Sequence, residues 1–375
     1  MKKNKPLIYI LIMFIIGVLI GVLSYHQFLS VLIEGLKLIK WYIVIIIFMM
    51  TLFISILVHE MGHLIVLLKE GIKIRALYVL CFTFVKHEKG WRFAIYPNLL
   101  KLVGGLVMPN LPLIEQEETY DKTIKSMSKA IQAGPLFSLG LAGFSIISFI
   151  LFWAIKNPIM SALSLYFMIF TLLITFLIWA ASKVSANGLY GDFVATDRLK
   201  KNSKFALMYI LSGGDTSDYQ AENETFLWKK IINELEKSTE VHSIEGQTFI
   251  SHYLDKIIFD QAIGSYAINE KLKYTYRNLN LQKIEHYTLA QQLLYFYYVY
   301  NENEAYIELQ NKLDQIKKNP KEEKTYLFWE QRTKYLTNQS KADDYKQRPY
   351  DYHKTGWILK PLKLKSIEEE PLIKN

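Results

Sequence analysis

Cysteine is nearly absent from this chain of 375 residues, because Cys81 is the only one. A single cysteine excludes an intrachain disulfide and every metal site built from cysteines alone, so zinc-ribbon and disulfide-scaffold proteins are ruled out. The chain also lacks a concentrated basic patch, since its net charge of +9 is spread along the sequence. We therefore predict no nucleic-acid partner and attribute the charge to cytoplasmic segments beside anionic lipid.

Long apolar runs are missing from the second half of the chain. Overall, 51% of the residues are hydrophobic, yet the mean hydropathy is only slightly above zero. Before about residue 182, four runs approach or exceed the roughly 20 residues that cross a lipid hydrocarbon core. They lie at 6–25, 41–68, 133–155 and 159–181. We predict a mainly α-helical, polytopic membrane protein with about four transmembrane helices.

The first apolar run imitates a secretory signal, because Lys2, Lys3 and Lys5 precede it. No small-x-small cleavage site follows before Tyr25, so we expect a retained first span. Basic residues also follow the last run and fill the 69–132 loop, and an even number of spans leaves all of them on one side. We expect a multi-pass cell-membrane protein with cytoplasmic N- and C-termini, and the residue bias suggests a bacterial inner membrane.

The loop between the second and third spans shows extended patterns. Residues 72–85 alternate and then become continuously β-branched and aromatic, a turn signal follows at Lys89-Gly90, and 91–95 resumes the pattern. This arrangement predicts a cytoplasmic β-hairpin. Residues 102–109 are apolar but interrupted by glycine and proline, so we expect a re-entrant loop in a protein-lined interior. Residues 120–130 predict an amphipathic helix that leads into the third span.

Beyond residue 205 the periodicity is helical and soluble. Paired helices of this size are similar to tetratricopeptide units, but no clean 34-residue repeat is present. Nothing in these helices suggests chemistry, so we expect them to recruit a protein partner or to gate access. Four domains are predicted: an added span with an interfacial segment at 1–40, a membrane core at 41–204, a cytoplasmic helical domain at 205–338 and a polar, flexible tail at 339–375.

Residues 59–63 read His-Glu-Met-Gly-His. His59 and His63 share one face of a helix and can bind one metal ion. Glu60 is turned away from ligation, yet it can take a proton from a water molecule whose pKa zinc lowers to near neutrality. The motif lies inside an apolar run, where ionisable groups are expensive and mark function. A pair of histidines bonding across helices is the alternative, but it leaves Glu60 unexplained.

The motif resembles the first motif of the site-2 proteases, which are intramembrane zinc metallopeptidases. Residues 133–138, Ala-Gly-Pro-Leu-Phe-Ser, are similar to the Gly-Pro-x-x-Asn/Ser element of this family. Gly104 and Gly105 lie where some members carry a re-entrant β-loop that would hold substrate. The resemblance covers roughly residues 41–200. It implies a three-span core, a zinc cofactor, and an endopeptidase that cuts membrane-anchored peptides or proteins near the cytoplasmic side of the bilayer.

Zinc needs a third protein ligand that leaves one position for water. The family takes an Asp near the end of the last core span, usually within Leu-Asp-Gly. Here Asp192 follows Gly191 instead, and we predict it as the ligand and as the N-cap of a helix. A plain helix cap is the alternative role, Asp197 is the reserve ligand, and Asn187 is expected to orient the site or hold substrate backbone.

Two other functions remain open. The departure of the Asp192 segment from the family pattern favours a catalytically inactive member that acts in peptide export or immunity. The second alternative is a sensor or transporter that binds zinc without hydrolysis.

Overall fold

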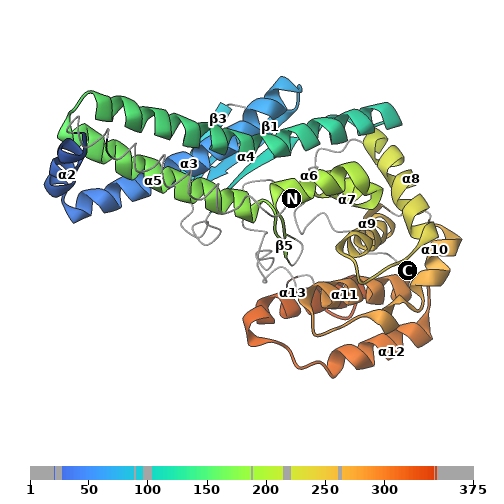
Figure 1. The fold of residues 1–375 in the computed structure, drawn as a ribbon. Helices are drawn as coiled ribbons and strands as arrows, with labels where there is room; N and C mark the ends of the chain where they lie inside the picture. The colour runs from blue at the N-terminus through green and yellow to red at the C-terminus, as the bar shows by residue number, and fades with distance from the viewer. Residues whose placement is uncertain are drawn as a thin grey trace, which may run out of the picture. The chain divides into compact units, whose positions relative to one another are not determined.

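The structure of the protein is a computed structural model. The chain folds into two compact units (Figure 1). One unit comprises residues 1–108 and 127–196, and the other comprises 109–126 and 197–375. The predicted first span, apart from Gly21, and nearly all of the predicted tail lie outside the described residues. The structure describes residues 21, 28–87, 90–95, 104–186, 189–213, 221–260, 264–341 and 343.

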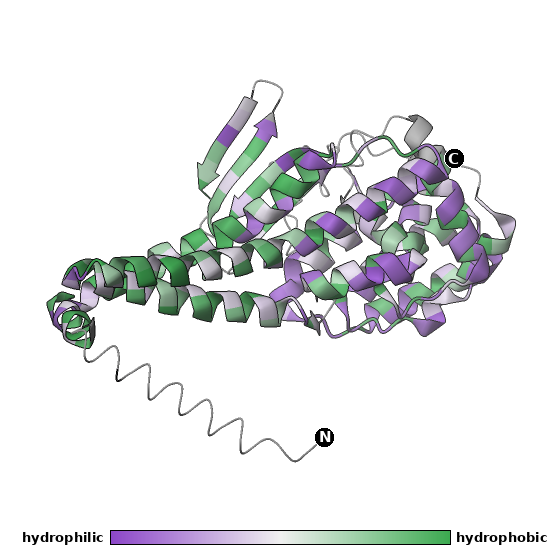
Figure 2. Ribbon diagram, turned by 45° about the horizontal axis from the view of Figure 1, so that its top comes forward, coloured by the Kyte–Doolittle hydropathy of each residue, from purple (hydrophilic) through white to green (hydrophobic). Residues whose placement is uncertain are grey.

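Three helices of the described residues are long and apolar enough to cross a membrane. They are α3 (Trp41–Lys69), α4 (Glu117–Ala154) and α5 (Pro158–Ala181). Large apolar side chains such as Met50, Phe144 and Phe176 are more than half exposed on them, which suits contact with lipid rather than water. Figure 2 shows apolar colouring along these long helices. The predicted fold class, a mainly α-helical membrane protein, is confirmed.

A tight break separates α4 from α5. Lys156 has a φ of 57°, and the side chain of Asn157 accepts a hydrogen bond from the backbone N–H of Met160, 3.0 Å away. Asn157 thereby caps α5, whose first residue is Pro158. The helix α2 (Phe28–Leu38) packs against α5, and its Gly35 lies so close to the Pro158 carbonyl that a side chain would overlap it.

The loop between α3 and α4 forms a four-stranded sheet in the order β3-β2-β1-β4. The predicted strand at 72–85 is wrong as a single element, because Leu80, with a φ of 55°, breaks it. The two halves pair with each other in an antiparallel register, with Leu77 opposite Phe84. No Gly, Pro, Asn or Asp marks this turn, so the local turn signals could not reveal it. The strands are β1 (Lys73–Val79), β2 (Phe82–His87), β3 (Gly90–Ile95) and β4 (Gly105–Asn110).

The predicted irregular loop at 102–109 is also corrected. From Gly105 onward it is strand β4, which lies at the edge of the sheet. Just before this strand, the Gly104 carbonyl accepts a hydrogen bond from Leu80 N–H, 2.9 Å away. Pro109 is tolerated because an edge strand leaves some backbone N–H groups unpaired. The depth of β4 in the bilayer stays a prediction.

After α5, a two-stranded hairpin of β5 (Ser185–Ala186) and β6 (Leu189–Tyr190) leads into α6 (Asp192–Lys201). The second unit is built mainly from helices. Within it, α11 is buried on nearly every side, including Tyr287, Leu293 and Tyr297, because α9, α12 and α13 pack around it. These helices are α7 (Ser203–Gly213), α8 (Ala221–Lys237), α9 (Ile244–Asp260), α10 (Tyr266–Leu272), α11 (Ile284–Val299), α12 (Asn303–Asp314) and α13 (Glu323–Leu336).

Candidate active site

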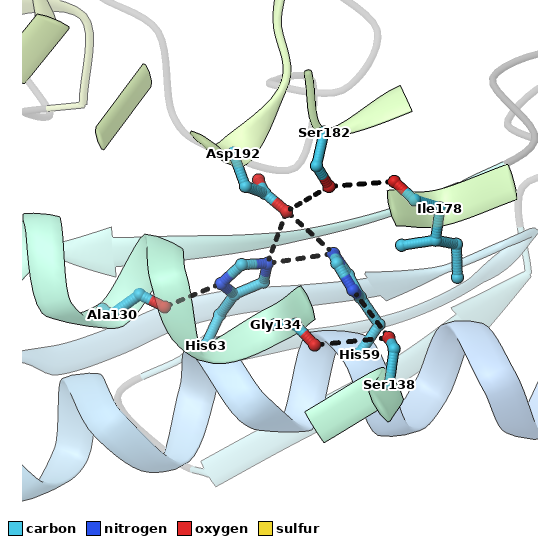
Figure 3. A network of polar contacts seen from close by, with 8 residues as sticks. All are labelled: His59, His63, Ala130, Gly134, Ser138, Ile178, Ser182 and Asp192. Atoms are coloured by element: carbon cyan, nitrogen blue, oxygen red, sulfur yellow. Dashed lines mark hydrogen bonds and ion pairs between the residues drawn. The ribbon is translucent and has the colours of Figure 1, made fainter. Parts of the chain in front are cut away.

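Two histidines of α3 are held by groups on α4 (Figure 3). The Nδ1 atom of His63 lies 2.9 Å from the Ala130 carbonyl, which can only accept, so this Nδ1 carries the hydrogen. The Nδ1 atom of His59 lies 3.1 Å from the Ser138 hydroxyl, which itself donates to the Gly134 carbonyl. Ser138 therefore accepts from His59. In the neutral form of both rings, this hydrogen-bond assignment leaves a lone pair on each Nε2 atom.

The two Nε2 atoms face each other and a carboxylate. They lie 3.2 Å apart, and Oδ2 of Asp192 is 3.2 Å from Nε2 of His59 and 3.8 Å from Nε2 of His63. In that state three acceptor atoms converge, an arrangement that a positive charge stabilises, either a metal ion or a proton on one ring. Tetrahedral zinc, with bonds of about 2.0 to 2.1 Å, places its ligand atoms about 3.3 to 3.4 Å apart. The spacing of the three residues is compatible with zinc, which they would hold with one ligand atom each.

Asp192 reaches this cluster because the turn after α5 folds back on the end of that helix. Phe193 N–H donates to the Ser182 carbonyl, 3.0 Å away. Gly191 lies so close to the Ala181 carbonyl and to Ser182 that a methyl group would overlap the helix end. Asp192 is the first residue of α6. The turn can therefore approach the end of α5 because a glycine immediately precedes Asp192. In the family pattern the glycine follows the acid instead.

Glu60 lies beside the two histidines. His59, Glu60 and His63 each offer one ligand atom, and these atoms all lie within 4.8 Å of one another. Glu60 is only 5% exposed. Gly105, the first residue of β4, contacts it so closely that a methyl group there would overlap its Cγ and lie 2.7 Å from its Oε1. Of the two predicted glycines, Gly105 lies at the carboxylate, and Gly104 precedes it in the chain.

Two further glycines let α3 and α4 approach each other at the site. A methyl group on Gly62 would lie 2.8 Å from the Ala133 carbonyl oxygen, and one on Gly134 would overlap the ring of His63. The sequence pattern contained both glycines, but the hydrogen-bonding roles of Ser138 and Ala130 were missed. A backbone carbonyl has no sequence signal, and the match of Ser138 to the Gly-Pro-x-x-Asn/Ser element does not indicate which atom its hydroxyl contacts.

Two further residues are predicted to contribute to the site. Asn187 lies outside the described residues. Asp197 is 58% exposed and forms an ion pair with Lys201 one helical turn away, with Oδ1 and Nζ 2.5 Å apart. This is the setting of a solvated surface residue.

Residues 47–316 match the family model of peptidase family M50. Comparisons with curated proteins and with solved structures found no match. Because the family match spans well over half of the chain, the chain belongs to peptidase family M50, the site-2 protease family. The predicted resemblance is confirmed, and the match reaches beyond residue 200 into the helices of the second unit. At the family level this is a membrane metalloprotease domain.

Proposed function

We propose that this protein is a zinc-dependent endopeptidase that cleaves membrane-anchored peptides or proteins near the cytoplasmic side of the bilayer. The observation that carries the proposal is the convergence of three acceptor atoms, from His59, His63 and Asp192, within 3.8 Å of one another. A positive charge among these atoms, a metal ion or a proton on one ring, stabilises the cluster, and the His-Glu-x-x-His spacing favours the metal ion. The adjacent buried Glu60 supplies the one group that hydrolysis needs in addition.

Different groups of the chain have different roles in the proposed hydrolysis. Zinc held by His59, His63 and Asp192 would supply Lewis-acid chemistry, lowering the pKa of a water molecule and polarising the scissile carbonyl. Glu60 takes the proton from the attacking water and returns it to the leaving nitrogen, acting first as base and then as acid. The Ser138 hydroxyl and the Ala130 carbonyl each contact an Nδ1 atom, which would leave both Nε2 atoms available to hold the metal.

Strand β4 is suited to present the substrate. It lies at the edge of its sheet and begins at Gly105, in contact with Glu60. A helical peptide bond is shielded by its own hydrogen bonds, so a transmembrane substrate must unwind before hydrolysis. We propose that the unwound segment pairs with β4 by strand addition, which would place its peptide bonds beside Glu60.

The test compares the membrane proteomes of cells that express the wild type, Glu60→Gln or Asp192→Ala. It also compares the zinc bound per chain in each of these proteins. We expect Glu60→Gln to keep about one zinc ion per chain while a membrane-anchored protein accumulates uncleaved, and Asp192→Ala to lose both zinc and cleavage. Asp197→Ala is the matched control and should behave as the wild type. An unchanged processing pattern in Glu60→Gln would refute the protease proposal, and retained zinc would then favour a sensor or transporter.

A further inference from the structure

The second unit contains a cavity of about 490 Å³ between α9, α11 and the short 3₁₀ turn at Pro320–Glu322. This volume lies within the range of about 300 to 1,000 Å³ that is typical of ligand sites. Its lining includes the carboxylates of Asp255, Glu285 and Glu322, and among the described residues no lysine or arginine lines it. The lining is mainly apolar and carries a negative charge at a few carboxylates, which suits a cation on an apolar stem.

A buried amide holds part of this lining in place. Gln292 of α11 is 3% exposed, and its side chain accepts a hydrogen bond from Ser251 and donates one to Asp255, each over 3.0 Å. Ser251 and Asp255 lie one turn apart on α9, so the single amide crosslinks the two helices. Asp255 is thereby fixed in orientation before any ligand arrives, which reduces the cost of ordering it on binding.

His252 also lines the cavity. Its ring has no hydrogen-bond or ion-pair partner among the described residues. Burial lowers the pKa of His252 to about 4, so the ring is neutral at pH 7 and adds no positive charge to the lining. A neutral imidazole keeps one acceptor nitrogen. The other nitrogen of the ring is a donor, so the carboxylates beside the ring, rather than the ring alone, favour a ligand that donates hydrogen bonds.

We propose that this cavity binds a lysine or arginine side chain of a basic peptide segment. Ammonium and guanidinium groups carry only donors and a positive charge, which matches the carboxylates of Asp255, Glu285 and Glu322 and the acceptor nitrogen of His252. Cytoplasmic flanks of membrane-anchored proteins are rich in Lys and Arg. The assignment of such a flank as the natural ligand rests on the proposed function, because a membrane-anchored substrate would carry one. The binding of a basic peptide to the cavity is independent of that function.

The test uses the full chain in a neutral detergent and a fluorescein-labelled peptide, Gly-Lys-Arg-Lys-Gly, with binding followed by fluorescence anisotropy. We expect saturable binding that weakens with salt, and no binding of the matched Gly-Glu-Glu-Glu-Gly peptide. Glu285→Gln with Glu322→Gln should weaken binding about tenfold, because it removes two charge-assisted contacts. Glu304→Gln on α12, an exposed residue with the same charge change, should bind as the wild type.

Two single variants and a competition experiment complete the binding measurements. Glu285 is exposed, so Glu285→Gln alone keeps the fold and should still weaken binding about threefold. His252→Phe, which removes both ring nitrogens, should weaken it by a similar factor. Unchanged affinity in the double variant would overturn the proposal. Displacement of the peptide by spermidine at lower concentration than by unlabelled peptide would assign the cavity to free polyamines instead. Glu60→Gln should bind the peptide normally, so this result does not depend on proteolysis.

Discussion

Replacing Gly134 with alanine places one methyl group inside the proposed metal-ligand cluster. Built on the backbone of Gly134, the methyl carbon overlaps Nε2 and Cε1 of His63 and lies 2.9 Å from Cε1 of His59. Carbon atoms in ordinary contact are about 3.5 to 4.0 Å apart. The ring of His59 must therefore move by about 0.6 Å, and that of His63 by more.

Neither ring can move without losing its hydrogen bond. Nδ1 of His63 is held by the Ala130 carbonyl and Nδ1 of His59 by Ser138. Metal–ligand distances tolerate only about 0.2 Å, so displacements of this size remove at least one ligand. Changes around metal ligands that leave the ligands themselves in place already weaken binding by about 10- to 100-fold. We expect Gly134→Ala to weaken zinc binding by at least about 100-fold and to abolish cleavage.

The assay is zinc per chain, measured by mass spectrometry after equilibration of the purified protein in detergent with a zinc-buffering chelator. Gly140→Ala is the matched control, because its methyl group, on the same helix, would meet no atom within 4 Å. It should bind zinc as the wild type does. Wild-type zinc affinity in Gly134→Ala would show that the histidine rings do not lie where this geometry places them.

Two other substitutions separate the base from the metal. Gly105→Ala places a methyl group 2.7 Å from Oε1 of Glu60 and overlapping its Cγ. The cleavage rate should therefore fall about 100-fold, while zinc per chain stays at the wild-type level. A parallel loss of zinc would contradict the assignment of Glu60 as base rather than ligand. Ser138→Ala removes the acceptor for Nδ1–H of His59, so chelator competition should show zinc binding about 10- to 100-fold weaker, and unchanged affinity would argue against the assigned tautomer.

The described spanning helices and the histidine pair were predictable from the sequence. Apolar runs long enough to cross a bilayer determine α3, α4 and α5, because unsatisfied backbone groups in lipid leave the helix as the available structure. The pairing of His59 with His63 follows from the 3.6-residue period of one helix. Both conclusions depend on neighbours in the chain, which a sequence displays directly.

The remaining features depend on tertiary packing. The turn at Leu80 and the strand β4 form because strands pair across the sheet, and β-propensity reflects such neighbours more than the residue itself. Likewise, only the fold brings Asp192 within 3.2 Å of His59 and places Ser138 at its other ring nitrogen. The sequence by itself determined the spans and the histidine pair, because helical periodicity is local. The tertiary structure decided the third acceptor and the ring tautomers, because those contacts join segments that only packing brings together.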